Sequence, residues 1–150
     1  MQSNEKWDLR FLNMAKHISQ WSKDPSTKCG AVIVAPNRSI VSLGYNGFPR
    51  GMLDDLSLYV DRQVKYDRVV HCEMNAILSA TQPVTGCTLY TWPLLSCPRC
   101  AVHTIQAGIV RCVSVTVPHD KVRRWNPEIQ KSLEYFREAG VEVQIYERLG

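Results

Sequence analysis

Residues 71–117 read "HCEMNAILSATQPVTGCTLYTWPLLSCPRCAVHTIQAGIVRCVSVTV", and the order of elements within this stretch decides the fold. The spacing of its apolar residues predicts four alternating elements: a helix over 71–80, a strand over 86–92, a helix over 97–107 and a strand over 109–117. Strands that alternate with helices are typical of an α/β sheet with helices packed on its faces.

The sequence downstream continues the same alternation. It predicts a helix over 126–139 and a last strand over 141–147. Gly140 lies between them, where glycine commonly ends a helix in the left-handed conformation.

The sequence upstream predicts a helix followed by a hairpin. The helix covers 4–22, and we expect its apolar stripe to lie in the core: Trp7, Phe11, Met14, Ile18 and Trp21. Pro25 ends the helical pattern, and two β-branched runs over 29–35 and 39–46 then indicate two paired strands. Residues 47–68 are too long for a tight turn, so we interpret them as a functional loop with a short helix.

Together these elements predict one α/β domain over residues 1–150. The hairpin makes its five-stranded sheet mixed, and the helices cover both faces, which gives a three-layer α/β/α arrangement. The length suits a single domain with a substantial core.

The composition excludes several classes of protein. No apolar run is long enough to cross a bilayer, and the polar start "MQSNEKWDLR" does not resemble a secretory signal, so we expect a cytoplasmic protein. The net charge of +4 is mild and the basic residues are scattered, which argues against a nucleic acid polymer as partner. In such a compartment, the six cysteines are thiols or metal ligands rather than disulfides.

Two motifs at predicted helix starts indicate a metal site. Cys97 and Cys100 in "SCPRC" are three residues apart, so both sulfurs can face one point, and His71 can add a nitrogen from the other helix. One His and two Cys leave one position of tetrahedral zinc open, which is typical of a catalytic Zn²⁺ site.

Glu73 gives this predicted site a catalytic group. It follows His71 by two residues, close to the metal without being a ligand, and can transfer protons from a water that zinc activates. An H-x-E motif followed by C-x-x-C is the signature of zinc nucleobase deaminases, although Ser96 stands where that signature has proline.

Each part of the motif also has a plainer interpretation. A C-x-x-C pair alone is also found in redox and structural zinc sites, and a single histidine is more often structural. A non-catalytic zinc module would need a fourth ligand, for which Cys72 and His103 are the candidates.

Three longer stretches of the sequence make the match to a deaminase family more specific than the metal motifs do. They are "SKDPSTKCGAVIV" at 22–34, "GYNGFPRGMLDD" at 44–55 and "KYDRVVHCEMNAI" at 65–77, and with them the chain resembles the deoxycytidylate deaminases of the cytidine deaminase superfamily. Cys72, where that family usually has alanine, and Met52, where it often has cysteine, depart from its pattern.

The resemblance implies a cytidine deaminase-like fold and the hydrolytic deamination of dCMP to dUMP. Zinc-activated water would attack C4 of cytosine, and Glu73 would protonate N3 and then the leaving ammonia. Asn46 would bind substrate near the base and sugar, and the backbone of Cys72 would lie against the base edge.

The resemblance also implies a homohexamer that dCTP activates and dTTP inhibits. The effector residues would come from one loop: Gly47, Arg50, Gly51, Asp54 and Asp55. The glycines let the backbone approach phosphates, Arg50 supplies charge, and the two aspartates can hold Mg²⁺ against a triphosphate. The alternative is an ordered surface loop with a solvated acidic pair.

The substrate phosphate needs a cation of its own. Arg123, Arg124 and Trp125 follow a strand end, so we expect one of them, with Arg124 and Trp125 as the candidates, to contact it. A solvated or core role for these residues is the alternative. A nucleoside, tRNA or single-stranded DNA substrate would keep the same chemistry, but the acidic loop disfavours polymers.

Overall fold

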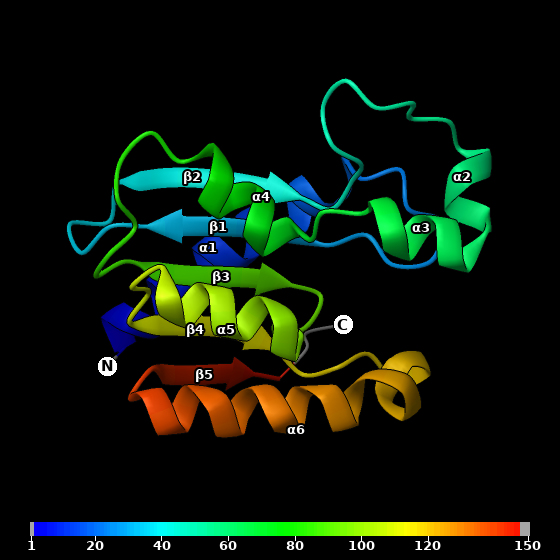
Figure 1. Cartoon of the computed structure of the whole chain (residues 1–150). Helices are drawn as coiled ribbons and strands as arrows, with labels where there is room; N and C mark the ends of the chain where they lie inside the picture. The colour runs from blue at the N-terminus through cyan, green and yellow to red at the C-terminus, as the bar shows by residue number, and fades with distance from the viewer. Residues whose placement is uncertain (1, 148–150) are drawn as a thin grey trace.

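The computed structural model describes residues 2–147, apart from the side chains of residues 2, 3 and 124 (Figure 1). The strands are β1 (Gly30–Val34), β2 (Ile40–Tyr45), β3 (Thr88–Trp92), β4 (Arg111–Val115) and β5 (Glu142–Tyr146). The helices are α1 (Gln2–Ser19), α2 (Ser57–Val60), α3 (Arg62–Arg68), α4 (Cys72–Ser79), α5 (Pro98–Gln106) and α6 (Val122–Ala139), with a 3₁₀ turn η1 (His119–Lys121) before α6.

The five strands form one mixed sheet in the order β2-β1-β3-β4-β5. β1 pairs antiparallel with β2 and with β3, whereas β3, β4 and β5 are parallel neighbours. Helix α1 covers one face, and α4, α5 and α6 cover the other (Figure 1). The predicted three-layer α/β/α fold with a mixed five-stranded sheet is therefore confirmed.

Helices α1 and α4 approach the sheet so closely that two glycines are required. A Cβ on Gly30 would clash with the carbonyl oxygen of Ala15 in α1. A Cβ on Gly44 would lie 2.6 Å from the backbone nitrogen of Ala76 in α4. Because real Cβ atoms do not make such contacts, both helices depend on glycine in the hairpin strands.

Two predicted helix boundaries were wrong. Helix α1 ends at Ser19 because its last turn tightens, with the Trp21 amide donating to Ile18 at 3.0 Å, and Trp21 is 55% exposed instead of lying in the core. Helix α6 begins four residues before the predicted start at 126, so that Pro127 lies inside it. Pro127 has no amide proton to donate to the carbonyl of Arg123, four residues earlier in the helix.

A buried ion pair fastens α1 to the sheet. The carboxylate of Asp8, which is 1% exposed, accepts two hydrogen bonds from Arg111 at 2.8 and 2.7 Å. The hydroxyls of Tyr90 and Tyr146 also donate to it, at 2.9 and 2.7 Å. Burial alone would raise the pKa of Asp8, but these four hydrogen bonds outweigh it and lower the pKa below 3.8.

Within residues 2–147, no helix has the length and apolar character that a membrane span requires.

Candidate metal centre

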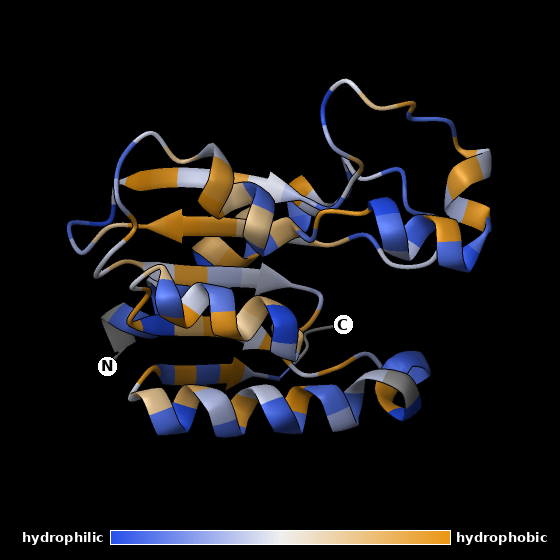
Figure 2. Ribbon diagram, viewed as in Figure 1, coloured by the Kyte–Doolittle hydropathy of each residue, from blue (hydrophilic) through white to orange (hydrophobic). Residues whose placement is uncertain are grey.

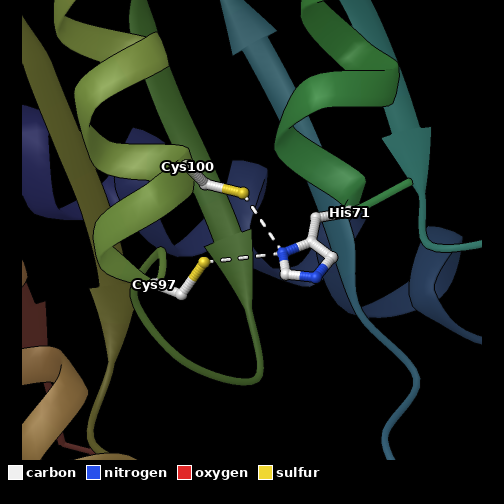
Figure 3. Close-up of side chains that lie close together, drawn as sticks. All are labelled: His71, Cys97 and Cys100. Atoms are coloured by element: carbon white, nitrogen blue, oxygen red, sulfur yellow. Dashed lines mark hydrogen bonds between the residues drawn. The ribbon is translucent and has the colours of Figure 1, made fainter. Parts of the chain in front are cut away.

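His71, Cys97 and Cys100 come together at the starts of two neighbouring helices. His71 is the residue before α4 and Cys97 the residue before α5, while Cys100 lies in the first turn of α5. Figure 3 shows the imidazole and both sulfurs pointing toward one another. The prediction that strand and loop ends would bring these side chains to one point agrees with this geometry.

The spacing of the three side chains fits a tetrahedral metal. Nδ1 of His71 lies 3.2 Å from the sulfur of Cys100 and 3.5 Å from that of Cys97, and all three ligand atoms lie within 4.8 Å of one another. Around zinc, Zn–S bonds of about 2.3 Å and Zn–N bonds of about 2.0 Å separate sulfur from nitrogen by roughly 3.5 Å. The donor set of one nitrogen and two sulfurs also suits zinc.

The three groups share protons in a way that favours a cation. A hydrogen bond from Cys100 is the main reason that the pKa of Cys97 falls to about 4. The hydrogen bond to Cys97 raises the pKa of His71 to about 9, and the bond between the two thiols raises the pKa of Cys100. Cys97 therefore loses its proton more readily than an ordinary thiol, and metal binding would release the remaining ligand protons.

Glu73 lies beside this group without belonging to it. Its side chain is 6% exposed, and its Oε1 accepts a hydrogen bond from the thiol of Cys72 at 3.2 Å. It also interacts with the thiol of Cys100, which contributes to the raised pKa of that thiol. Glu73 therefore lies within reach of the metal site but is not one of its three ligand groups.

His71, Cys97 and Glu73 line a pocket. Its lining combines residues from the loop before β1, from the end of β2, from α3 and the start of α4, from the segment between β3 and α5, and from α6: Asp24, Ser26, Thr27, Cys29, Asn46, Lys65, Tyr66, Val69, His71, Cys72, Glu73, Leu94, Leu95, Cys97 and Trp125. Four predicted substrate or catalytic residues, Asn46, Cys72, Glu73 and Trp125, are thus in the same cavity as two of the predicted metal ligands.

Asn46 is held firmly in the pocket wall. Its Oδ1 accepts the backbone amide of Cys29 at 2.8 Å. Its Nδ2 donates to the carbonyl of Thr27 at 2.9 Å and to Asp24 at 3.4 Å. Both amide protons are therefore engaged within the protein, and one lone pair of Oδ1 remains for a ligand.

The pocket also contains an ion pair that the sequence did not predict. Lys65 of α3 lies 3.2 Å from Asp24, and the two side chains are 9% and 5% exposed. Asp24 in addition accepts the backbone amide of Ser26 at 2.8 Å. Both residues lie in the stretches that carried the family resemblance, but a separation of 41 residues in sequence gave no sign that they pair.

Of the other residues predicted to contact the substrate phosphate, Arg123 is exposed, and the side chain of Arg124 lies outside the described part of the chain. The predicted effector residues occupy the loop before α2: Gly47, Arg50, Gly51, Asp54 and Asp55.

The two aspartates of this loop have partners within the chain. Asp54 pairs with Lys23 at 3.0 Å and accepts the hydroxyl of Tyr59 at 3.1 Å. Asp55 accepts the amide of Ser57, which lowers the pKa of its exposed carboxyl.

The candidates for a fourth protein ligand do not reach the metal site. His103 is exposed and its Nδ1 bonds the carbonyl of Arg99 at 2.6 Å, while the thiol of Cys72 points to Glu73. Among the described residues only His71, Cys97 and Cys100 form a metal-binding group. This geometry supports an open site over the closed site of a structural zinc module.

Comparison with known sequences assigns the chain to a family. Residues 5–116 match the family model of the cytidine and deoxycytidylate deaminase zinc-binding region. An uncharacterized deaminase in the luxG 3' region of Aliivibrio fischeri is 44% identical over 138 residues, 92% of each chain. The deoxycytidylate deaminase of Mus musculus is 41% identical over 110 residues, which are 69% of this chain and 61% of the mouse protein.

Solved structures share the fold. The apo dCMP deaminase of cyanophage S-TIM5 superposes with a TM-score of 0.68 at 24% identity, covering 92% of this chain and 95% of that one. The same phage enzyme in complex with dCMP and dUMP gives a TM-score of 0.67 at 23% identity, covering 91% and 93%. The sequence match over residues 5–116, together with the shared fold, shows that this chain belongs to the cytidine and deoxycytidylate deaminases.

Proposed function

We propose that this chain catalyses the zinc-dependent hydrolytic deamination of dCMP to dUMP and ammonia, as one catalytic domain. The observation that carries the proposal is the position of buried Glu73 in the wall of a pocket, beside the group of His71, Cys97 and Cys100. The names of the mouse relative and of the phage enzyme crystallised with dCMP and dUMP support the choice of substrate.

His71, Cys97 and Cys100 would hold the zinc ion. When bound, zinc lowers the pKa of a water molecule from about 15.7 to about 7 and so makes a nucleophile available at neutral pH. The three protein ligands leave room for such a water because His103 and Cys72 point elsewhere.

Glu73 would transfer the protons. Its carboxylate would accept a proton from water and donate it to N3 of cytosine as the water oxygen attacks C4. It would then take the second proton of that oxygen and deliver it to the amino group on C4, which leaves as ammonia while the C4 carbonyl forms. A positioned carboxylate of this kind contributes about 10²- to 10⁴-fold in rate. The thiol of Cys72 holds one oxygen of this carboxylate in place through its 3.2 Å hydrogen bond.

Asn46 and the start of α4 would position the nucleoside. The free lone pair on Oδ1 of Asn46 can accept a hydrogen bond from a sugar hydroxyl, and its fixed orientation lowers the entropy cost of binding. The backbone of Cys72 would lie against the base edge. Leu94 and Leu95, which are buried, would exclude water from the base.

The substrate phosphate would bind near Lys65. Among the described residues that line the pocket, Lys65 is the one Lys or Arg, and Ser26 and Thr27 line the same pocket with groups that can donate hydrogen bonds. Asp24 neutralises part of the charge of Lys65, so a further cation is needed for a dianionic phosphate. Arg124, next to the pocket-lining Trp125, is our candidate for it.

Regulation and assembly belong to the same proposal. A homohexamer would respond to dCTP as activator and dTTP as inhibitor through Gly47, Arg50, Gly51, Asp54 and Asp55, with Mg²⁺ bridging the aspartates and the triphosphate. The exposed guanidinium of Arg50 lies 3.5 Å from Ser79, at the end of α4, and this contact links the loop to the helix that carries Glu73. The six free cysteines suit a cytoplasmic protein.

The test is a substrate panel on purified, zinc-loaded protein. Ammonia release and loss of cytosine absorbance are followed with dCMP, deoxycytidine, dCTP and a cytosine-containing oligonucleotide, each with and without dCTP or dTTP as effector. We expect turnover of dCMP, raised by dCTP and lowered by dTTP. Turnover of the oligonucleotide or of deoxycytidine in preference to dCMP would refute the proposed substrate, and effector-independent turnover would refute the proposed regulation.

A further inference from the structure

Two thiols that the proposed metal site does not use meet in the wall of the pocket. Cys29 is half-buried and directly precedes β1, whereas Cys72 is 2% exposed and is the first residue of α4. Both line the same pocket as Glu73, and both are free cysteines. In the proposed deamination the thiol of Cys72 holds Glu73, but Cys29 has no part.

The register of the sheet turns Cys29 toward Cys72. Cys29 extends the pairing of β1 with β2 by one residue, because its carbonyl accepts the amide of Asn46 at 3.3 Å. Successive side chains along a strand point to opposite faces, so Cys29 and Ala31 point to the same face. Ala31 lies opposite Gly44 of β2, and a Cβ on Gly44 would lie 2.6 Å from the carbonyl oxygen of Cys72. Cys29 is therefore on the face of β1 that α4 covers, and Figure 2 shows β1 as a largely hydrophobic strand there. Cys29 and Cys72 accordingly pack in one apolar cluster.

The two thiols are in direct contact. Burial raises the pKa of the Cys72 thiol, and a hydrogen bond with the side chain of Cys29 raises it further. The thiol of Cys72 also donates to Oε1 of Glu73 at 3.2 Å, so its sulfur contacts both Cys29 and the carboxylate. Thiols in contact are the starting geometry for a disulfide bond, in which the sulfurs lie about 2.05 Å apart.

We propose that Cys29 and Cys72 form an oxidative modification site, at which a peroxide converts the two thiols into a disulfide. Cys29 is the better first target, because it is half-buried in the pocket wall whereas Cys72 is buried. Its sulfur would attack the O–O bond of hydrogen peroxide, which gives a sulfenic acid and one water. The sulfur of Cys72 would then displace the hydroxyl group from Cys29, and this hydroxyl leaves as a second water with the thiol proton of Cys72. The two sulfurs thus lose two electrons that the peroxide gains, and a thiol reductant restores both thiols.

The disulfide would interfere with the proposed deamination at two points. The sulfur of Cys72 would no longer have a proton to donate, so Oε1 of Glu73 would lose its hydrogen bond. A movement of Cys29 would also disturb Asn46, because the amide of Cys29 donates to Oδ1 of Asn46 at 2.8 Å. This loss of activity rests on the proposed function, whereas formation of the disulfide does not.

Peptide mapping of peroxide-treated protein tests the modification site directly. Zinc-loaded protein is treated with hydrogen peroxide, its remaining thiols are alkylated, and disulfide-linked peptides are identified by mass spectrometry. We expect a linkage between Cys29 and Cys72 that dithiothreitol removes, with the zinc content unchanged. The dCMP turnover of the treated protein should fall by about tenfold or more, because a displaced catalytic group loses rate steeply, and should return with dithiothreitol.

Single substitutions separate this pair from the other cysteines. Cys29→Ser and Cys72→Ala each remove one of the two sulfurs, so treated samples of both should keep most of the turnover that the same variant has before treatment. The matched control is Cys87→Ser, which removes a buried thiol that does not line the pocket, and it should lose turnover as the parent does.

The absence of a Cys29–Cys72 linkage in the treated parent would overturn the proposal, as would a loss of turnover in Cys29→Ser equal to that of the parent. A linkage between Cys97 and Cys100 with release of zinc would assign the sensitivity to the metal ligands and would also overturn it. A lack of dCMP turnover in untreated protein would refute the proposed function, while the peptide map would still decide the modification site.

Discussion

At the scale of single residues, the ion pair of Asp24 and Lys65 places two charged groups in the wall of the pocket. Both side chains are buried, so each depends on the other for charge compensation. The pair lies at the part of the pocket formed by α3, whereas Glu73 lies at the start of α4. We propose that a substrate with a phosphate uses Lys65 for its charge and Glu73 for the chemistry.

Lys65→Gln tests the phosphate position. We expect the ratio of kcat/KM for dCMP to kcat/KM for deoxycytidine to fall by about tenfold or more, because a charge-assisted hydrogen bond to phosphate is lost. The ratio is measured on one protein sample, so a loss of active protein cancels. An unchanged ratio would show that the phosphate binds elsewhere, and Arg62→Gln, on the same helix but exposed, serves as the control.

Cys97→Ser and Cys100→Ser test the metal ligands. Each variant should lose most of its zinc, because a serine hydroxyl is a poor substitute for a thiolate ligand. Zinc content after dialysis is the measurement, and Cys87→Ala, which removes a buried thiol outside the site, should retain zinc. Full zinc occupancy in either serine variant would contradict the assignment.

At the scale of elements, the packing of α4 on β2 positions His71 and Glu73. Gly44 allows the close approach, since its Cβ position lies 2.6 Å from backbone atoms of both Ala76 and Cys72. Any side chain at residue 44 has to push away α4, whose first turn carries Glu73, the residue we propose for proton transfer.

Gly44→Ala should therefore reduce both stability and activity. We expect a loss of about 1–3 kcal/mol in the free energy of unfolding, as for other overpacked sites, together with a lower kcat. Chemical denaturation and steady-state kinetics are the measurements. Gly47→Ala is the control, because a Cβ there meets only the hydroxyl of Tyr59 at an ordinary 3.8 Å. If Gly44→Ala and Gly47→Ala had equal free energies of unfolding and equal kcat, the close contact between Gly44 and α4 would not have the role given to it here.

The attachment of helix α1 to the sheet depends on the ion pair of Asp8. Asp8→Asn leaves Arg111 without its buried charge partner, and we expect a loss of about 3–5 kcal/mol at neutral pH. The pKa of Asp8 is lowered in the folded protein, so its contribution is present above its unfolded value of 3.8 and is lost as pH falls through the folded value. The stability difference between parent and variant should therefore narrow below about pH 4; a constant difference down to strong acid would be inconsistent with this ion pair.

At the scale of the whole molecule, the sequence predicts the architecture better than it predicts side-chain partners. The alternation of apolar segments after residue 70 defines the sheet and its helices, and residues 71, 97 and 100 stand at helix starts that the fold brings together. Local sequence patterns suffice to predict these helices and strands, because apolar periodicity and turn residues depend on residues that are close together in the sequence.

The partners that the sequence did not predict depend on contacts between distant segments. Lys65 and Asp24 are 41 residues apart, and nothing in either stretch encodes their pairing. Trp21 continues the helical stripe of α1 but lies beyond the last turn, so it is exposed and contacts the ring of Tyr45 instead. Likewise, only the fold shows that Leu53, Leu56 and Val60 are exposed while Tyr59, in the same segment, is buried.

The central claim is that His71, Cys97 and Cys100 hold zinc while Glu73 transfers the protons. Its most direct test measures zinc content and dCMP turnover on the same samples of parent protein and Glu73→Gln. We predict equal zinc content, with kcat lower by about 10²- to 10⁴-fold in the variant, because the amide keeps the shape of the side chain but cannot transfer a proton. A Glu73→Gln protein that deaminates dCMP at the parental rate with full zinc would contradict the account.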